Sequence, residues 1–108
     1  MDATGTALWE ALKPLWPSNA EVNETPHRHL VVTYLTLDDD LRPGRRSREV
    51  ELQISEPVLH RLDAATADGR HTMAHAIAAR LKGLLKQEDL RADLSEPIVY
   101  VIDEGWIY

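Results

Sequence analysis

The fold is decided by one stretch in the middle of the chain, Arg48-Glu49-Val50-Glu51-Leu52-Gln53-Ile54-Ser55-Glu56-Pro57, residues 48–57. Polar and apolar residues alternate from 49 to 54, which is the pattern of a strand with one buried face and one face in water. Ser55 and Pro57 then indicate a helix start, because serine is a favoured N-cap and proline fits the first helical turn. A half-buried strand followed at once by a helix predicts a sheet that helices cover on one side.

Two helices are expected after this strand. The first carries an apolar face and is expected to end at Asp68-Gly69, since glycine suits a left-handed helix end. The second is expected from His71 or Thr72 to Gln87, because apolar residues recur there on one helical face. The members of this apolar stripe are Met73, Ile77, Leu81, Leu84 and Leu85.

Two further strands, 29–37 and 97–102, are expected on either side of this unit. Both are apolar on two faces, so we expect them to be neighbours in the sheet. Pro43-Gly44 marks a turn, which predicts a long-looped hairpin between 29–37 and 48–55. Residues 4–16 predict a short helix capped by Thr4 or Thr6, and 18–26 and 88–96 are expected to be loops. The tail 103–108 is expected to continue the last strand past a glycine bulge.

These elements predict a single α+β domain over residues 1–108. The expected architecture is a small three-stranded, mainly antiparallel sheet covered by helices, in the order α-β-β-α-α-β. Strands 48–55 and 98–102 would then lie at the two edges. The strand 98–102 has no charged residue to discourage pairing with another chain. We therefore expect a symmetric homodimer that buries this strand or the aromatic tail.

Composition removes several function classes. The chain has 108 residues and no cysteine, which excludes disulfides, zinc–thiolate sites, iron–sulfur clusters and thiol catalysis. No secretory signal or membrane-spanning apolar run is visible, so a cytoplasmic protein without membrane contact is expected. The formal net charge of −6 disfavours non-specific nucleic-acid binding. Neither a glycine-rich phosphate loop nor a G-x-S-x-G elbow occurs, so neither enzymatic activity nor a cofactor is expected.

Two groups of residues are candidates for binding. An arginine loop and the aromatic C-terminus are candidates for contact with a protein partner, because guanidinium forks grip carboxylates and phosphates and aromatic side chains anchor interfaces. These partner-binding candidates are Arg42, Arg45, Arg46, Arg48, Trp106 and Tyr108. Two histidine pairs are weaker candidates for a zinc, nickel or copper site, since each pair is spaced to lie on one side of its element. These are His27, His29, His71 and His75.

The segment from Val50 to Leu85 resembles the strand–helix–turn–helix of ribbon-helix-helix repressors. The resemblance rests on the alternating strand, on Ser55-Glu56-Pro57, and on Asp68-Gly69-Arg70 between two apolar helical patterns. It implies that the outward strand residues would read the DNA major groove. Those residues are Glu49, Glu51 and Gln53, and two carboxylates would be repelled by phosphates. No site residue is carried over from this family.

The function expected from the sequence is therefore a non-enzymatic interaction or regulatory module that binds another protein. Three alternatives stay open. The first is a nucleic-acid-directed regulator that uses the arginine loop or the ribbon-like strand. The second is a small metal-binding protein built on the histidine pairs. The third is an acidic inhibitor of the kind that phages encode, which would occupy a basic site on another protein.

Overall fold

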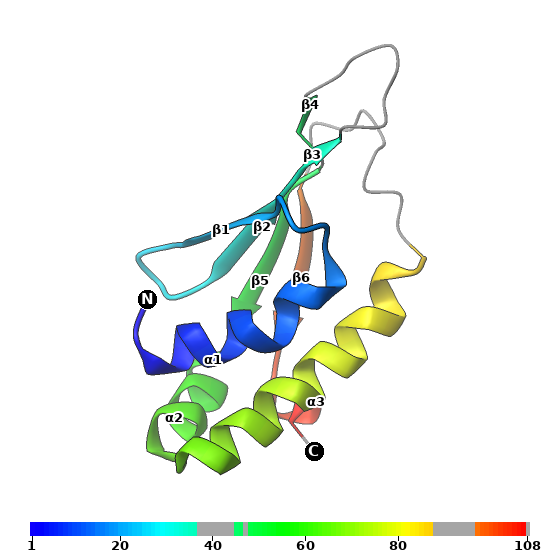
Figure 1. Cartoon of the computed structure of the whole chain (residues 1–108). Coiled ribbons are helices and arrows are strands. Elements are labelled where there is room, and N and C mark those ends of the chain that lie inside the picture. Colours follow the sequence, from blue (N-terminus) through cyan, green and yellow to red (C-terminus); the bar gives the residue numbers. More distant parts are fainter. Residues whose placement is uncertain (37–44, 47, 88–96, 108) are drawn as a thin grey trace.

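The protein is built from one layer of helices packed on one face of a β-sheet (Figure 1). The computed structural model describes residues 1–36, 45–46, 48–87 and 97–107. The helices are α1 (Ala3–Leu12), α2 (Glu56–Ala64) and α3 (Ala67–Leu85), with short 3-10 helices η1 (Lys13–Leu15) and η2 (Glu104–Trp106). The strands are β1 (Glu21–Glu24), β2 (Leu30–Thr33), β3 (Leu35–Thr36), β4 (Arg45–Arg46), β5 (Val50–Ile54) and β6 (Ile98–Ile102).

The predicted α+β class is confirmed, but the sheet differs from the predicted one. It has four strands in the order β1-β2-β5-β6, and β3 and β4 form a separate two-stranded ribbon. The hairpin partners β2 and β5 are antiparallel as predicted, whereas β5 and β6 are parallel. The expectation that strand 48–55 is an edge and that strand 98–102 neighbours the first strand is wrong. Because α2 and α3 carry the chain back along the sheet, β6 runs in the same direction as β5 and lies beside it.

Strand β1 lies in a segment that the sequence predicts as a loop. Its residues are Glu-Val-Asn-Glu, and Val22 alone packs against the core while the other three are exposed. An edge strand with a single apolar contact shows no hydrophobic pattern, so the prediction missed it. Its antiparallel pairing with β2, from Glu21 opposite Thr33 to Glu24 opposite Leu30, moves β2 to the interior of the sheet.

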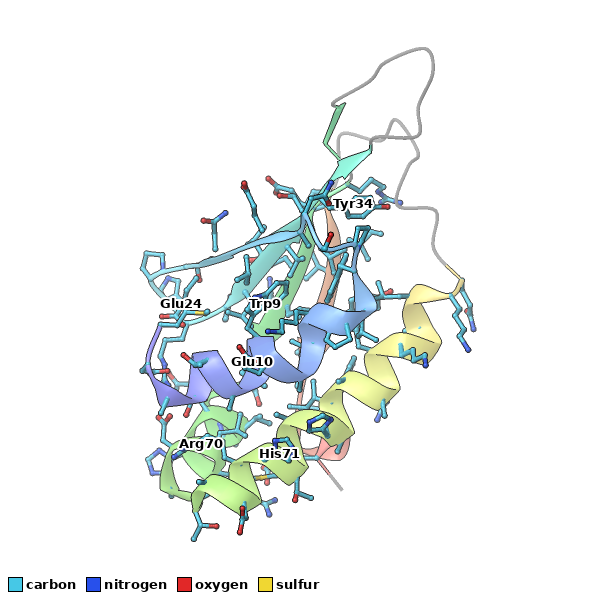
Figure 2. The ribbon with its side chains drawn as sticks, viewed as in Figure 1. Trp9, Glu10, Glu24, Tyr34, Arg70 and His71 are labelled. Carbon is cyan, nitrogen blue, oxygen red and sulfur yellow. The ribbon has the colours of Figure 1, made fainter. Side chains whose placement is uncertain are left out.

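One hydrophobic core joins the two layers. The inward face of the sheet and the apolar faces of all three helices meet in it, as the alternation in β5 and the helical stripes predict. The largest fully buried side chains are Leu8, Leu12, Leu30, Leu52, Leu62, Ile77, Leu81, Ile102, Val32, Val50 and Val58. The two tryptophans of the N-terminal segment belong to this packing. Trp16 is buried, and Trp9 packs between α1 and the sheet with its ring 6.1 Å from that of Trp16 (Figure 2).

The ends of the helices also differ from the prediction. The side chain of Asp2, and not Thr4 or Thr6, caps α1 by accepting a hydrogen bond from Gly5. Thr66 caps α3, so Asp68-Gly69 lies in the first turn of α3 instead of ending α2. The guanidinium of Arg70 donates to the carbonyl oxygens of Leu62 and Ala65 and so satisfies the end of α2. The turn between α2 and α3 is therefore fixed by the side chains of Thr66 and Arg70, and not by Gly69 as predicted.

The C-terminal segment folds back onto the helices and does not extend β6. Asp103 caps η2 by accepting a hydrogen bond from the backbone N–H of Gly105 at 2.9 Å. This turn buries Trp106, whose ring lies 6.4 Å from that of Tyr100 and 4.9 Å from the Arg80 guanidinium carbon. The expected continuation of the strand through 103–108 is therefore wrong for the described part, because a capped turn brings the apolar tail into the core.

Candidate interaction surface

The sheet has one face that is not covered by any described helix. We call it the open face and define it by five outward side chains of β2, β5 and β6, namely Val31, Glu51, Gln53, Val99 and Val101. The register aligns Val31, Glu51 and Val99 across the three strands, and Gln53 and Val101 across two. Val99 is 45% exposed and Val101 is 58% exposed, and with Met1 they are the exposed large hydrophobic residues of the described chain.

Strand β6 forms one edge of the four-stranded sheet. The Ile98 N–H donates to the Glu49 carbonyl on one side, and the Ile102 carbonyl accepts from the Ser55 N–H on the same side. Successive residues of a strand direct their backbone groups to opposite sides. Residues 98, 100 and 102 therefore bond to β5, while the N–H and C=O groups of Val99 and Val101 point away from the sheet. The same two residues thus carry both the exposed side chains and the outward backbone groups.

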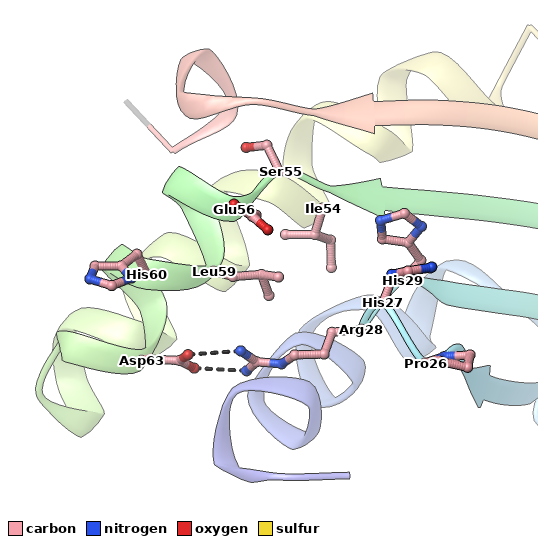
Figure 3. A pocket seen from close by; sticks show the side chains of 10 residues that line it. All are labelled: Pro26, His27, Arg28, His29, Ile54, Ser55, Glu56, Leu59, His60 and Asp63. Atoms are coloured by element: carbon pink, nitrogen blue, oxygen red, sulfur yellow. Dashed lines mark hydrogen bonds and ion pairs between the residues drawn. The ribbon is translucent and has the colours of Figure 1, made fainter.

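A pocket of about 600 Å³ lies beside the sheet, between the β1–β2 turn and the start of α2 (Figure 3). Its lining includes three histidines: His27 and His29 from the turn and His60 from α2. His29 also approaches Glu51, with 3.9 Å between Nδ1 and a carboxylate oxygen. The pocket therefore adjoins the polar end of the open face.

Arg28 closes one side of this pocket and ties three segments together. Its guanidinium donates two hydrogen bonds of 2.8 Å to the two carboxylate oxygens of Asp63 on α2 (Figure 3). It donates another of 2.8 Å to Asp2 at the start of α1. The buried hydroxyl of Thr4 donates to the same Asp63 carboxylate. Arg28 has a φ of 64°, which non-glycine residues seldom adopt, so the turn is held in a costly conformation that these ion pairs offset.

The charges of this cluster reinforce one another. The hydrogen bonds from Arg28 and Thr4 lower the pKa of Asp63 well below its ordinary value. The hydrogen bond from Arg28 to Asp63, with the nearby Asp2 carboxylate, raises the pKa of Arg28 above its already high value. Both groups are therefore ionised at every physiological pH and neutralise each other. The cluster holds the fold together and leaves neither charge free for a ligand.

The histidine candidates fall into two separate places. The rings of His27 and His29 lie 6.1 Å apart in the β1–β2 turn (Figure 3). Those of His71 and His75 lie 4.2 Å apart and are exposed on α3, where Figure 2 labels His71. Among residues 1–36, 45–46, 48–87 and 97–107, no three histidine, aspartate or glutamate side chains come together as ligands for a metal ion. The two pairs therefore do not build the four-nitrogen site that their spacing allows.

The partner-binding candidates are also dispersed. Arg45 and Arg46 form β4, opposite Thr36 and Leu35 of β3, and Arg48 lies half-buried just before β5. Trp106 is buried against the core, so it contributes packing. Arg42 and Tyr108 lie outside the described residues. The described arginines thus lie near one end of the sheet, whereas Trp106 is buried in the core.

Comparison with known proteins adds no relative. No family model, curated protein or solved structure matches the chain. Within the described part of the chain, no helix is long and apolar enough to cross a membrane.

In the β-α-α segment that resembles ribbon-helix-helix repressors, β5 is flanked by β2 and β6 in one sheet. The strand is therefore an interior strand of a larger sheet.

Sequence reasoning missed the Arg28–Asp63 cluster. The two residues are 35 positions apart and neither belongs to a motif. Arg28 follows Pro26-His27, which signals a turn but gives no sign of a left-handed residue. The exposed valines were visible in the sequence as a strand that is apolar on both faces. Their exposure depends on the strand order, because an apolar residue on the outward face is covered only if another layer packs there.

Proposed function

We propose that the chain is a non-enzymatic interaction module that binds another protein through the open face and the edge of β6. One observation carries the proposal: Val99 and Val101, exposed on the uncovered side of the sheet, are also the residues whose backbone groups point outward. Exposed aliphatic groups next to unpaired backbone groups are what an added strand needs. Strand addition uses the backbone for affinity and alternate side chains for specificity.

The composition of the open face supports protein contact. Its three valines are interleaved with Glu51 and Gln53, and His29 lies at its end. Protein interfaces combine an apolar centre with a polar rim that can exchange hydrogen bonds. The carboxylate of Glu51 in the middle of this face favours a partner that brings a lysine or arginine next to its apolar residues.

The pocket beside Arg28 supports an enzymatic function less well. Arg28 and Asp63 are engaged with each other, and the three histidines are accompanied by Glu56 and the apolar side chains of Ile54 and Leu59. A catalytic site needs a nucleophile or base positioned toward a free, preorganised charge. The ion pair here stabilises the turn instead, which favours a binding function over a catalytic one.

The proposal is tested with a charge placed on the open face away from the edge. Val31→Lys puts an ammonium group in the centre of the face, where Glu51 in the neighbouring strand can neutralise it and keep the fold. Ala79→Lys is the matched control, since Ala79 is exposed on α3. Tagged wild-type and variant chains are cross-linked in cells of the source organism, and the attached proteins are quantified by mass spectrometry.

We expect one protein to attach to the wild-type chain and to Ala79→Lys in equal amounts. With Val31→Lys, the amount of that attached protein should fall at least about tenfold. A loss of about tenfold corresponds to 1.4 kcal/mol, within the range for an interface residue. Equal attachment to all three chains, or no attached protein at all, contradicts the proposal. Circular dichroism of the three purified chains checks that Val31→Lys is folded.

A further inference from the structure

Strand β6 reads the same in both directions. Its sequence is Ile98-Val99-Tyr100-Val101-Ile102. When two copies of such a strand lie antiparallel about a two-fold axis at Tyr100, each residue meets its counterpart in the palindrome. Ile98 then lies opposite Ile102 of the other copy, and Val99 lies opposite Val101. The side chains of one strand are therefore matched in kind and size by those of the other.

The backbone of β6 is directed as this register requires. Val99 and Val101 point their N–H and C=O groups away from β5. In the register centred on Tyr100, Val99 and Val101 of the two copies form two hydrogen-bonded pairs, each of which exchanges both of its N–H···O bonds. If the register shifted by one residue, the outward backbone groups of Val99 and Val101 would face residues of the other copy whose backbone groups are already bonded to β5, so no hydrogen bonds could form. A shift by two would bring in Pro97, which lacks a donor, or the charged Asp103.

The charges around β6 also permit a second copy. The strand has no ionisable charge, and in the register centred on Tyr100 the flanking Asp103 lies opposite Pro97. No carboxylate of residues 97–103 therefore faces another carboxylate, although the chain has a net charge of −6. The opposite edge of the sheet, β1, begins with Glu21 and ends with Glu24, and those charges discourage pairing there.

We propose that the edge of β6 is occupied by a second copy of this chain, with the two-fold axis passing by Tyr100. This inference rests on the proposed function and divides the contact surface between two partners: the second copy pairs with the β6 edge, and the other protein binds the open face. The pairing joins two four-stranded sheets into one and brings Val99 and Val101 of both copies together as a single apolar strip on the open face. The exposed valines of one copy thereby pack beside those of the other.

The test uses the absence of cysteine from the chain. In the register centred on Tyr100, the Tyr100 residues of the two copies form a non-hydrogen-bonded pair. The two Cα atoms of such a pair lie about 4.5 Å apart, which is within disulfide reach. Tyr100→Cys is therefore expected to form a covalent dimer of twice 12.2 kDa on mild oxidation. Val99→Cys is the control: it is on the exposed face, but in this register it lies roughly 8 Å from its own copy, beyond disulfide reach. Slow, partial cross-linking of Val99→Cys and rapid, complete cross-linking of Tyr100→Cys is the expected result. Equal rates for the two variants, or no dimer with Tyr100→Cys, overturn the inference.

A second measurement does not depend on the folding of Tyr100→Cys, which loses the ring packed against Trp106. Light scattering at high micromolar concentration is expected to give the wild type a mass of twice 12.2 kDa. Val101→Pro removes one outward N–H while leaving the bonds to β5 in place, because proline is tolerated where an edge strand faces away from its sheet. This variant is expected to be monomeric, whereas Val101→Thr, which keeps the N–H, stays dimeric.

A monomeric wild type, or a dimeric Val101→Pro, overturns the second copy as occupant. Neither result contradicts the proposed function, because that function is tested separately by Val31→Lys. This substitution changes the centre of the open face and leaves the backbone of β6 unaltered. If the wild-type chain is monomeric and Val31→Lys still loses the attached protein, the interaction module is supported and only the dimer is refuted.

Discussion

Replacement of Asp63 by asparagine isolates the contribution of the charge that holds the β1–β2 turn to α2. Asparagine keeps an acceptor for Thr4 but cannot receive both hydrogen bonds of the Arg28 guanidinium as a carboxylate does. The side chains of Arg28 and Asp63 are 32% and 46% exposed, so solvent screens the pair and its strength is near the upper end for surface ion pairs. We expect Asp63→Asn to lower the free energy of unfolding by about 1 kcal/mol at neutral pH.

The same substitution has a predicted dependence on pH. Because the pKa of Asp63 is lower in the folded chain than in the unfolded chain, its ionisation stabilises the fold above the unfolded value of about 4. That stabilisation is lost as the pH falls through the lowered pKa of the folded chain. The difference in unfolding free energy between wild type and Asp63→Asn is therefore expected to be constant above about pH 5 and to shrink as the pH falls below about 4 toward the lowered pKa of the folded chain.

Urea unfolding, followed by the fluorescence of the three tryptophans, measures both effects. Glu10→Gln is the control: Glu10 on α1 forms an exposed ion pair of 3.0 Å with Lys13, three residues further along the chain, and its loss is expected to change stability by less than about 0.5 kcal/mol. Unchanged stability of Asp63→Asn at neutral pH refutes the assigned role of the ion pair. An equal loss at neutral pH and at about pH 2 refutes the role of the ionised carboxylate.

Three further predictions concern packing, helix ends and metal. Arg70→Ala should lower the free energy of unfolding by about 1–2 kcal/mol, because the carbonyls of Leu62 and Ala65 lose the hydrogen bonds that Arg70 donates; Arg70→Lys should recover only part, and chemical denaturation of the two variants compares them. Leu81→Ala should cost about 2–5 kcal/mol, since Leu81 on α3 is fully buried in the core, and a thermal melt that matches the wild type would contradict the described core. A chelator should leave the melting temperature unchanged, because no three ligands converge within the described ranges; a fall that zinc reverses would show a structural metal.

The sequence predicts the elements of this fold better than their order. The alternation from Glu49 to Ile54 identifies β5 and its buried face, because that signal lies within one strand. The position of β6 beside β5 depends on where α2 and α3 return the chain, and no local pattern encodes it. The edge strand β1 was missed since Val22 is its one core contact. Helix ends differ by a few residues from the prediction, because Asp2 caps α1 in place of Thr4 or Thr6, and Thr66 begins α3 before Gly69 can end α2.

The sequence predicts only part of the candidate surface, because it shows local patterns but not how the elements pack together. The uncharged, doubly apolar strand 98–102 was recognised as an exposed edge, and the structure places it there. The aromatic tail was predicted as a contact surface, but Trp106 packs inward because the Asp103 cap turns the chain back. The pocket between the β1–β2 turn and α2 combines residues from 26 to 63, whose proximity depends on the tertiary fold. Spacing along the chain indicates which side chains share an element, and packing determines which elements share a site.

Amide hydrogen exchange along β6 tests the central claim, that this edge and the open face form the contact surface. In dilute solution the outward amides of Val99 and Val101 should exchange rapidly, while those of Tyr100 and Ile102, bonded to β5, should be protected. As the concentration of the chain rises, or as the attached protein is added, the amides of Val99 and Val101 should become protected and the outer amides of β1 should not. Protection that appears on α1 or α3 while Val99 and Val101 continue to exchange rapidly would contradict the account.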